Sequence, residues 1–214
     1  MPTAEPLWDA HSMTTYFTSD THFAHENLIN KMGRKGFYDW KHHDEELLNN
    51  INETVDRNDT LVIAGDFSWG NPQKYRQRIR CKTIRFVIGN HDKPKRTKET
   101  FGTYSHIQEI KTKALGKVVV CHYPIIYWPR SHRGAFHVYG HTHQKAEPIL
   151  DAIFPQRKSM DIGIDNAIEL LGKARPFSEE EIYEILKDRT GHHRVNDAHE
   201  AEFISSLRPV YPPL

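Results

Sequence analysis

Five separated segments of this chain carry side chains that bind metal ions, and each segment follows a short apolar run. The segments are Asp20-Thr21-His22, Gly65-Asp66, Gly89-Asn90-His91-Asp92, His122 and Gly140-His141-Thr142-His143. The runs before them are rich in β-branched and aromatic residues and predict short buried strands. Binding sites in open α/β sheets form where strands end, so we expect these side chains to meet.

The donor types in these segments indicate a two-metal centre. Its seven candidate ligands are Asp20, His22, Asp66, Asn90, His122, His141 and His143. That set is too large for one ion and suits two ions that share a bridging carboxylate. Asp20 and His22 lie two apart, as do His141 and His143, so both side chains of a pair point the same way on an extended segment. Nitrogen and oxygen donors without thiolate favour transition metals, and we expect two divalent ions, Mn before Fe, Zn or Ni.

A charge count narrows the reaction that such a centre would support. Two divalent ions, two carboxylates and a bridging hydroxide leave a charge of about +1. A positive site attracts a phosphate dianion and stabilises the charge that builds on its oxygens. Paired metals also lower the pKa of bound water and clamp a phosphoryl group, so the residues favour phosphoester hydrolysis over ion storage.

The composition sets limits on partners and location. The chain has 214 residues, a formal net charge of +1, 15 histidines and 37% hydrophobic residues. Such a charge gives no general basic field, so strong binding to duplex nucleic acid is not expected. No apolar run could span a membrane, no secretory signal is visible, and Cys81 and Cys121 form no disulfide framework. We therefore expect a cytoplasmic protein without a membrane partner.

The predicted elements alternate early and then form a hairpin-rich second half. Helices are expected over 24–31, 38–55 and 71–80, and after a capping box that begins at Ser178. Strands over 107–113 and 117–121 should pair as a hairpin, a last strand should span 159–164, and the basic stretch 93–98 should be a solvated loop. This order predicts an α/β fold of two mixed β-sheets flanked by helices. One domain is expected over 13–188, with 1–12 and 189–214 as flexible or weakly docked tails.

Taken in order, the five motifs resemble those of the calcineurin-like metallophosphoesterase superfamily. The phrases beginning at Phe17, His122 and Gly140 are similar to those of its small single-domain bacterial and phage members. The resemblance covers residues 16–143 and implies an αββα sandwich with a dinuclear centre.

The resemblance also implies a role for each motif residue. One metal would be held by Asp20, His22, Asp66 and His143, and the other by Asp66, Asn90, His122 and His141. Asp66 would bridge the two ions through a shared carboxylate. His91 would be the catalytic residue, facing the leaving group without binding metal. Many members have Asp or Asn where this chain has Trp69, which puts the substrate contacts in this region in question.

The substrate stays open at this point. Candidate substrate-binding residues are His25, Asn27, Arg130 and Arg133, although a helix N-terminus or a solvated loop explains them as well. The expected partner is a phosphomonoester or phosphodiester, including a nucleotide or a nucleic-acid end, and the oligomeric state is not indicated. One alternative is a catalytically weak scaffold that binds a protein, but scaffolds of this fold typically lose motif histidines that this chain retains. A nuclease is the other alternative, and the charge of +1 disfavours it.

Overall fold

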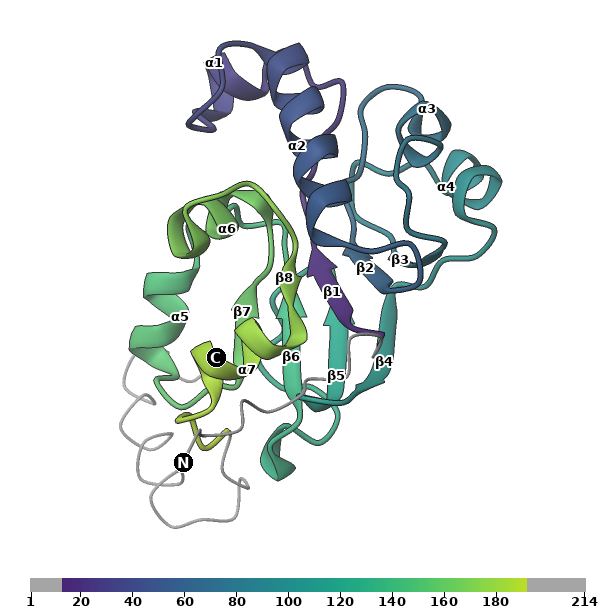
Figure 1. Ribbon diagram of the computed structural model, residues 1–214. Coiled ribbons are helices and arrows are strands. Elements are labelled where there is room, and N and C mark those ends of the chain that lie inside the picture. Colours follow the sequence, from purple (N-terminus) through teal and green to yellow (C-terminus); the bar gives the residue numbers. More distant parts are fainter. Residues whose placement is uncertain (1–12, 192–214) are drawn as a thin grey trace, which may run out of the picture.

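The computed structural model describes residues 13–191, and these form two packed four-stranded sheets with helices around them (Figure 1). The predicted α/β fold of two mixed sheets flanked by helices is thus confirmed. The predicted tail 1–12 and residues 192–214 of the predicted tail 189–214 lie outside the described residues. No helix between residues 13 and 191 is both long and apolar enough to cross a membrane.

The first sheet has the strand order β3-β2-β1-β8. Its strands are β1 (Thr15–Thr18), β2 (Thr60–Ala64), β3 (Thr83–Val87) and β8 (Phe177–Ser178). The first three run parallel, and β8 pairs antiparallel with β1. Because parallel strands end at one edge, the loops with Asp20, Asp66 and Asn90 come together there.

The second sheet has the strand order β4-β5-β6-β7. Its strands are β4 (Ile107–Thr112), β5 (Gly116–Cys121), β6 (Phe136–Tyr139) and β7 (Ser159–Asp161). β4 and β5 pair antiparallel, which confirms the predicted hairpin, while β6 and β7 run parallel to β5. His122 and His141 therefore follow strands that end at the same edge.

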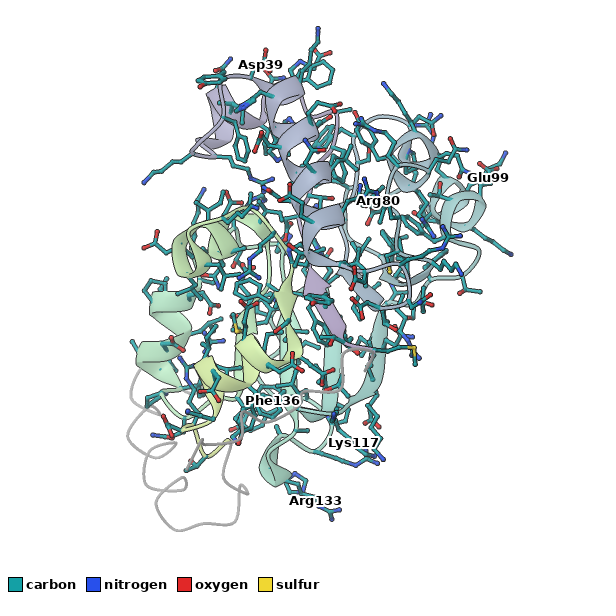
Figure 2. All side chains as sticks on the ribbon, viewed as in Figure 1. Asp39, Arg80, Glu99, Lys117, Arg133 and Phe136 are labelled. Atoms are coloured by element: carbon teal, nitrogen blue, oxygen red, sulfur yellow. The ribbon has the colours of Figure 1, made fainter. Side chains whose placement is uncertain are left out.

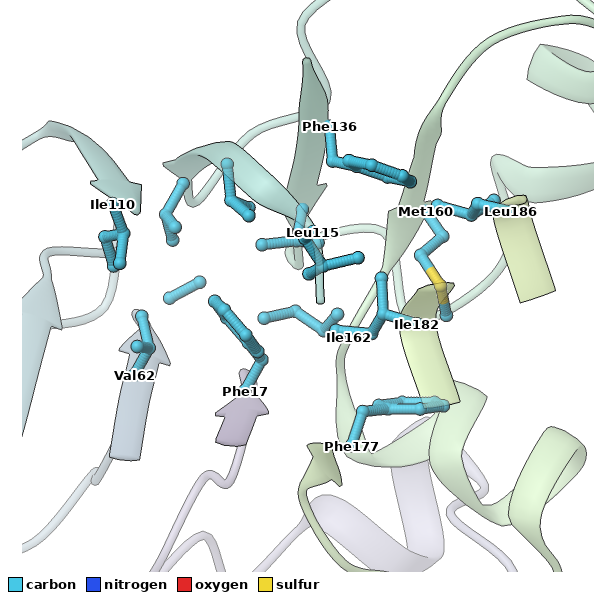
Figure 3. Close-up of a cluster of buried hydrophobic side chains, with 14 of the residues drawn as sticks. Phe17, Val62, Ile110, Leu115, Phe136, Met160, Ile162, Phe177, Ile182 and Leu186 are labelled. Carbon is cyan, nitrogen blue, oxygen red and sulfur yellow. The ribbon is translucent and has the colours of Figure 1, made fainter. Parts of the chain in front are cut away.

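Alternation along the strands builds the core between the two sheets. In β2, Val62 and Ala64 face the second sheet, whereas Leu61 and Ile63 pack beneath the helices on the other side. Figure 3 shows Val62 and Phe17 of the first sheet opposite Ile110 and its neighbours. Burying each such side chain contributes about 1.5–3 kcal/mol, so the core fixes how the two strand edges face each other.

Helices cover the outer sides of this sandwich. In Figure 1, α2, α3 and α4 lie beyond the first sheet, while α5, α6 and α7 gather near β7 and β8. Helix α2 buries Leu47, Leu48 and Ile51 on one stripe, and the Asp39 carboxylate caps its start by accepting from His42 N–H at 2.8 Å. The helices are α1 (Leu28–Met32), α2 (Trp40–Thr54), α3 (Pro72–Arg76), α4 (Pro94–Phe101), α5 (Glu147–Ile153), α6 (Ile164–Leu171) and α7 (Glu179–Leu186), with a 3₁₀ turn over Ser131–Arg133.

Several predicted element boundaries were wrong. Residues 24–27 belong to the motif loop, so α1 begins only at Leu28, and α3 ends at Arg76 rather than near residue 80. The basic stretch predicted as a loop opens α4, because Pro94 suits the first helical turn and Phe101 stacks on Phe86 at 4.2 Å. The last strand stops at Asp161, because Gly163 begins the turn into α6.

Candidate metal centre

The backbone turns sharply at the strand ends that carry the candidate ligands. Asp20, His22, Asp66, His141 and His143 have φ between 48° and 70°, the left-handed region. The prediction that the Asp20–His22 pair and the His141–His143 pair lie on extended segments was therefore wrong. Such conformations cost on the order of 1 kcal/mol or more for a residue with a Cβ, and they concentrate at functional sites. Here the turns point the side chains of several loops toward one place.

Motif glycines allow these loops to approach each other closely. Gly65 has φ 90°, and a Cβ there would lie 2.6 Å from Gly89 Cα and 2.7 Å from His122 Nδ1. A Cβ on Gly140 would collide with the Ser19 and Asp20 side chains. Each glycine thus leaves space that a neighbouring motif fills, which explains why glycine precedes the ligands.

A first group of ligand atoms comes from Asp20, His22 and His143, and all lie within 4.8 Å of one another. Asp20 Oδ1 is 3.6 Å from His22 Nε2 and 3.8 Å from His143 Nε2, and the two rings stack with centroids 5.1 Å apart. This carboxylate oxygen is buried and accepts no hydrogen bond from the described residues. A buried, charged oxygen without a partner is costly, so the three residues fit a cation between them.

A second group comes from Asp20, Asp66 and His122, again within 4.8 Å. Asp66 Oδ2 is 3.4 Å from His122 Nε2 and 3.9 Å from His22 Nε2, so it lies between the two groups. Asn90 Oδ1 is 2.9 Å from both His122 Nε2 and His141 Nδ1. Asp66 Oδ1 accepts the His91 N–H at 2.9 Å, which leaves Oδ2 to face the ligand groups.

Two histidines are held with Nε2 directed into the centre. His122 Nδ1 donates to the Ala64 carbonyl at 2.7 Å, and His143 Nδ1 donates to Asp165 Oδ2 at 2.7 Å. Burial lowers the pKa of His143, but the bond to Asp165 and the charge of Asp20 outweigh it and leave the pKa raised. Likewise, Asp66 and Asp20 overcome burial and raise the pKa of His122 to about 9. The carboxylates therefore create a field that attracts positive charge.

Arg34 and Asp165 form an ion pair that holds His143 and the backbone at Asp20 in position. Arg34 is 3% exposed, and it pairs with Asp165 through Nε at 3.1 Å and Nη2 at 2.8 Å. It also donates to the Asp20 carbonyl at 2.7 Å. The hydrogen bond from His143 and the Arg34 charge overcome burial and hold the pKa of Asp165 well below its usual range. A carboxylate that accepts from a metal-binding histidine orients the ring and increases its basicity.

Asp92 and Asp161 tie the motif loops together. Asp92 accepts the backbone N–H groups of Gly89, Asp66 and Phe67 at 2.8–3.0 Å. Asp161 accepts from the Thr142 hydroxyl at 2.9 Å and Gln144 N–H at 3.0 Å, and it fixes the loop with His141 and His143. Burial and the charge of Asp20 raise the pKa of Asp161 to about 7.

Three residues of the site were not predicted from the sequence: Arg34, Asp161 and Asp165. Asp161 carried a usable signal, since it is a carboxylate inside the last predicted strand, just before a glycine turn. Asp165 lies in the first turn of α6 and Arg34 in the loop after α1, where sequence alone gives no reason to connect them.

His91, Trp69 and His25 lie beside the ligand groups. The His91 ring is 4.8 Å from Trp69 and 5.9 Å from His22, and it belongs to neither ligand group. His25 lies 4.4 Å from Trp69 and 5.8 Å from His22. Trp69 Nε1 donates to His22 Nδ1 at 3.1 Å. An indole N–H only donates, so this bond requires the His22 proton on Nε2, the nitrogen that faces the ligand group.

Of the other predicted substrate contacts, Arg130 and Arg133 are not brought to the site. Asn27 is exposed at the start of α1, where its side chain makes no capping bond. Arg130 forms a surface ion pair with Glu109 at 2.5 Å. Arg133 ends the 3₁₀ turn that precedes β6, and Figure 2 shows it at the lower end of the molecule. Because β5 and β6 are parallel, the loop before β6 lies at the opposite end of the sheet from His122 and His141.

Comparisons with known proteins agree with this geometry. The family model of the calcineurin-like phosphoesterase superfamily domain matches residues 13–152. The gene 66 protein of Mycobacterium phage L5 is 26% identical over 220 residues, covering 88% of this chain and 97% of that protein. An uncharacterised protein of Methanocaldococcus jannaschii is 28% identical over 154 residues, covering 70% of this chain and 81% of that protein.

Among solved structures, a protein of unknown function from Aquifex aeolicus is similar with a TM-score of 0.61 and 25% sequence identity, covering 81% of this chain and all of that chain. The family match spans all five motifs and confirms the resemblance that they carry. The chain therefore belongs to the calcineurin-like phosphoesterase superfamily and is a metallophosphoesterase.

Proposed function

We propose that this metallophosphoesterase hydrolyses a phosphomonoester or phosphodiester, including a nucleotide or a nucleic-acid end, at a dinuclear centre. The observation that carries the proposal is Asp20 Oδ1, a buried oxygen that accepts no hydrogen bond within residues 13–191 and faces two histidine Nε2 atoms. Asp66 Oδ2, between the two ligand groups, supports two ions rather than one.

The candidate ligands form two sets that share the Asp66 carboxylate. One ion would be held by Asp20, His22, Asp66 and His143, and the other by Asp66, Asn90, His122 and His141. Two divalent transition-metal ions, with Mn as the first candidate, would supply a bridging hydroxide nucleophile and a charge that binds phosphoryl oxygens. The residues behind the ligands, Asp165 and Asp161, keep His143 and its loop in place.

The position of His91 supports a role in assisting the leaving group. Its backbone N–H binds Asp66 Oδ1, so the residue is anchored to the proposed bridge, yet its ring belongs to neither ligand group. The ring is exposed beside Trp69, where a substrate can reach it. A protonated imidazole there would donate its proton to the departing alkoxide oxygen, a role typically worth about 10²–10⁴ in rate.

The test compares two esters on wild-type protein and His91→Ala, both loaded with Mn. An alkyl phosphate has a basic leaving group that needs a proton, whereas 4-nitrophenyl phosphate does not. We expect His91→Ala to retain metal and to lose about 10²–10⁴ of its rate on the alkyl ester, with a smaller loss on the aryl ester. His132→Ala, on the exposed 3₁₀ turn at the other end of the sheet, is the matched control.

Other results of this experiment would assign His91 a different role. Equal losses on both esters with metal intact would show that His91 stabilises charge or positions phosphate instead of donating a proton. Loss of metal from His91→Ala would place this residue among the ligands. Absence of metal-dependent turnover across phosphomonoesters, phosphodiesters, cyclic nucleotides and short nucleic acids would contradict the proposed reaction.

A further inference from the structure

A cavity of about 210 Å³ opens beside His91, between the loop after β2 and helix α4. Trp69, Lys93, Arg96 and Phe101 are among the residues that line it. The cavity shares His91 and Trp69 with the candidate metal centre. In an in-line displacement the leaving group departs opposite the nucleophile, and the proposed general acid stands on that side. The space beyond His91 is therefore where a leaving group would extend.

Two positively charged side chains that line this cavity have no carboxylate partner among the described residues. Lys93 and Arg96 are exposed, and neither forms an ion pair within residues 13–191. Asp92 is the carboxylate among the lining residues, and three backbone N–H groups already occupy it. Arginine and lysine side chains without a carboxylate partner are suited to binding phosphate.

The shape of the cavity sets the size of its ligand. Trp69, whose ring centroid lies 4.8 Å from that of His91, and Phe101 provide apolar surface for a short carbon chain or a ring edge. A volume of about 210 Å³ is below the roughly 300–1,000 Å³ of sites for drug-sized ligands. Arg96 also lines a wider adjoining groove, which gives the leaving group an open path outward. A few carbon atoms ending in a phosphate would fit between these walls.

We propose that this cavity is a leaving-group subsite for a second phosphoryl group, with Lys93 and Arg96 as its specificity-determining residues. The preferred substrate then carries two phosphoryl groups separated by a short linker, and the one nearer the metals is hydrolysed. This inference rests on the proposed function, because the position of the leaving group follows from the proposed roles of the metals and His91.

Binding of unreactive analogues tests the subsite without any turnover. Propane-1,3-bisphosphonate and propylphosphonate differ by one phosphonate, and their affinities for metal-loaded protein are measured by calorimetry. We expect the bisphosphonate to bind at least about tenfold more tightly, as one charge-assisted hydrogen bond would give. Arg96→Gln and Lys93→Gln should each remove most of that preference. Lys98→Gln is the control, because Lys98 lies on the same helix and outside the cavity.

Turnover of the corresponding esters gives the second measurement. We expect kcat/KM for propane-1,3-diol bisphosphate to exceed that for the monophosphate by about tenfold, and Arg96→Gln should abolish the difference. Equal affinities in wild-type protein, or an equal loss in Lys98→Gln, would overturn the subsite even if both esters are hydrolysed. If neither ester is hydrolysed, that result counts against the proposed function. The binding preference for the bisphosphonate would then test the subsite by itself.

Discussion

Replacing Asp165 with asparagine should weaken metal binding and destabilise the fold at once. The Asp165 carboxylate lies between His143 Nδ1 at 2.7 Å and Arg34, whose Nε and Nη2 donate to it at 3.1 and 2.8 Å. Asparagine keeps the shape of the side chain and removes its negative charge. The His143 ring therefore loses the nearby negative charge that makes Nε2 a stronger electron-pair donor to a metal ion. Arg34 loses its ionic partner.

The two effects have different sizes. Outer-shell partners of metal-binding histidines are worth about 10–100-fold in metal affinity, which corresponds to about 1.4–2.8 kcal/mol. Breaking a buried ion pair from one side costs about 3–5 kcal/mol in folding stability. Arg34 is 3% exposed but keeps its bonds to the Asp20 and Thr21 carbonyls, and Asp165 is 19% exposed. We therefore expect a loss near the lower limit, about 3 kcal/mol.

The assay separates metal affinity from stability. Mn affinity is measured by calorimetric titration of metal-free protein, and stability by urea unfolding of the same metal-free protein. Asp151→Asn is the matched control, because Asp151 likewise pairs with arginine, lying 2.8 Å from both Arg157 and Arg189, but contacts no ligand candidate in the described part of the chain. It should lose stability and keep its Mn affinity. Unchanged Mn affinity in Asp165→Asn, or an equal decrease in Asp151→Asn, would refute the role assigned to Asp165.

Three further predictions concern the bridge, the tryptophan and a buried histidine. Wild-type protein purified without chelator should contain more than one transition-metal equivalent, and Asp66→Asn should lose both ions or nearly all activity; a single equivalent with full activity would contradict the dinuclear centre. Metal on His22 Nε2 moves the proton to Nδ1 and breaks the Trp69 bond, so zinc titration should change tryptophan emission in wild-type protein but not in Trp69→Phe. Burial lowers the pKa of His137 from 6.5 to about 4, because the buried ring is kept neutral. The folding stability that comes from this neutral ring is therefore complete above pH 6.5 and is lost as the pH falls toward 4. Urea unfolding should show that loss, at most about 3 kcal/mol, and His137→Gln should show less of it.

Local patterns in the sequence accounted for the strands and the ligand motifs. Short apolar runs followed by Asp, Asn or His marked the ends of β1, β2, β3, β5 and β6. These signals are local, since a buried strand and a turn each depend on a few consecutive residues. The hairpin of β4 and β5 was predictable for the same reason. Helices α5 and α6 were missed, because their short sequences carry little periodic pattern.

The supporting network could not be predicted, because its contacts join distant parts of the chain. Arg34 reaches Asp165 across 131 positions, and His143 meets the same carboxylate from a third segment. Nothing near Arg34 in sequence indicates that it is buried or that it binds the Asp20 carbonyl. Such contacts arise only when both sheets and α6 are packed.

The left-handed ligand residues show how packing overrides local preference in the site. Asp20, Asp66 and His143 would each favour another backbone conformation in an isolated chain, and five ligands together cost several kcal/mol at about 1 kcal/mol or more each. The bonds of Asp92 to Gly89, Asp66 and Phe67 and the core beneath the loops offset that cost. An extended Asp-x-His segment cannot be distinguished from a turned one by residue types alone. The gathering of these candidate ligands at the strand ends was therefore predictable, whereas the backbone conformation that brings them together depends on the completed fold.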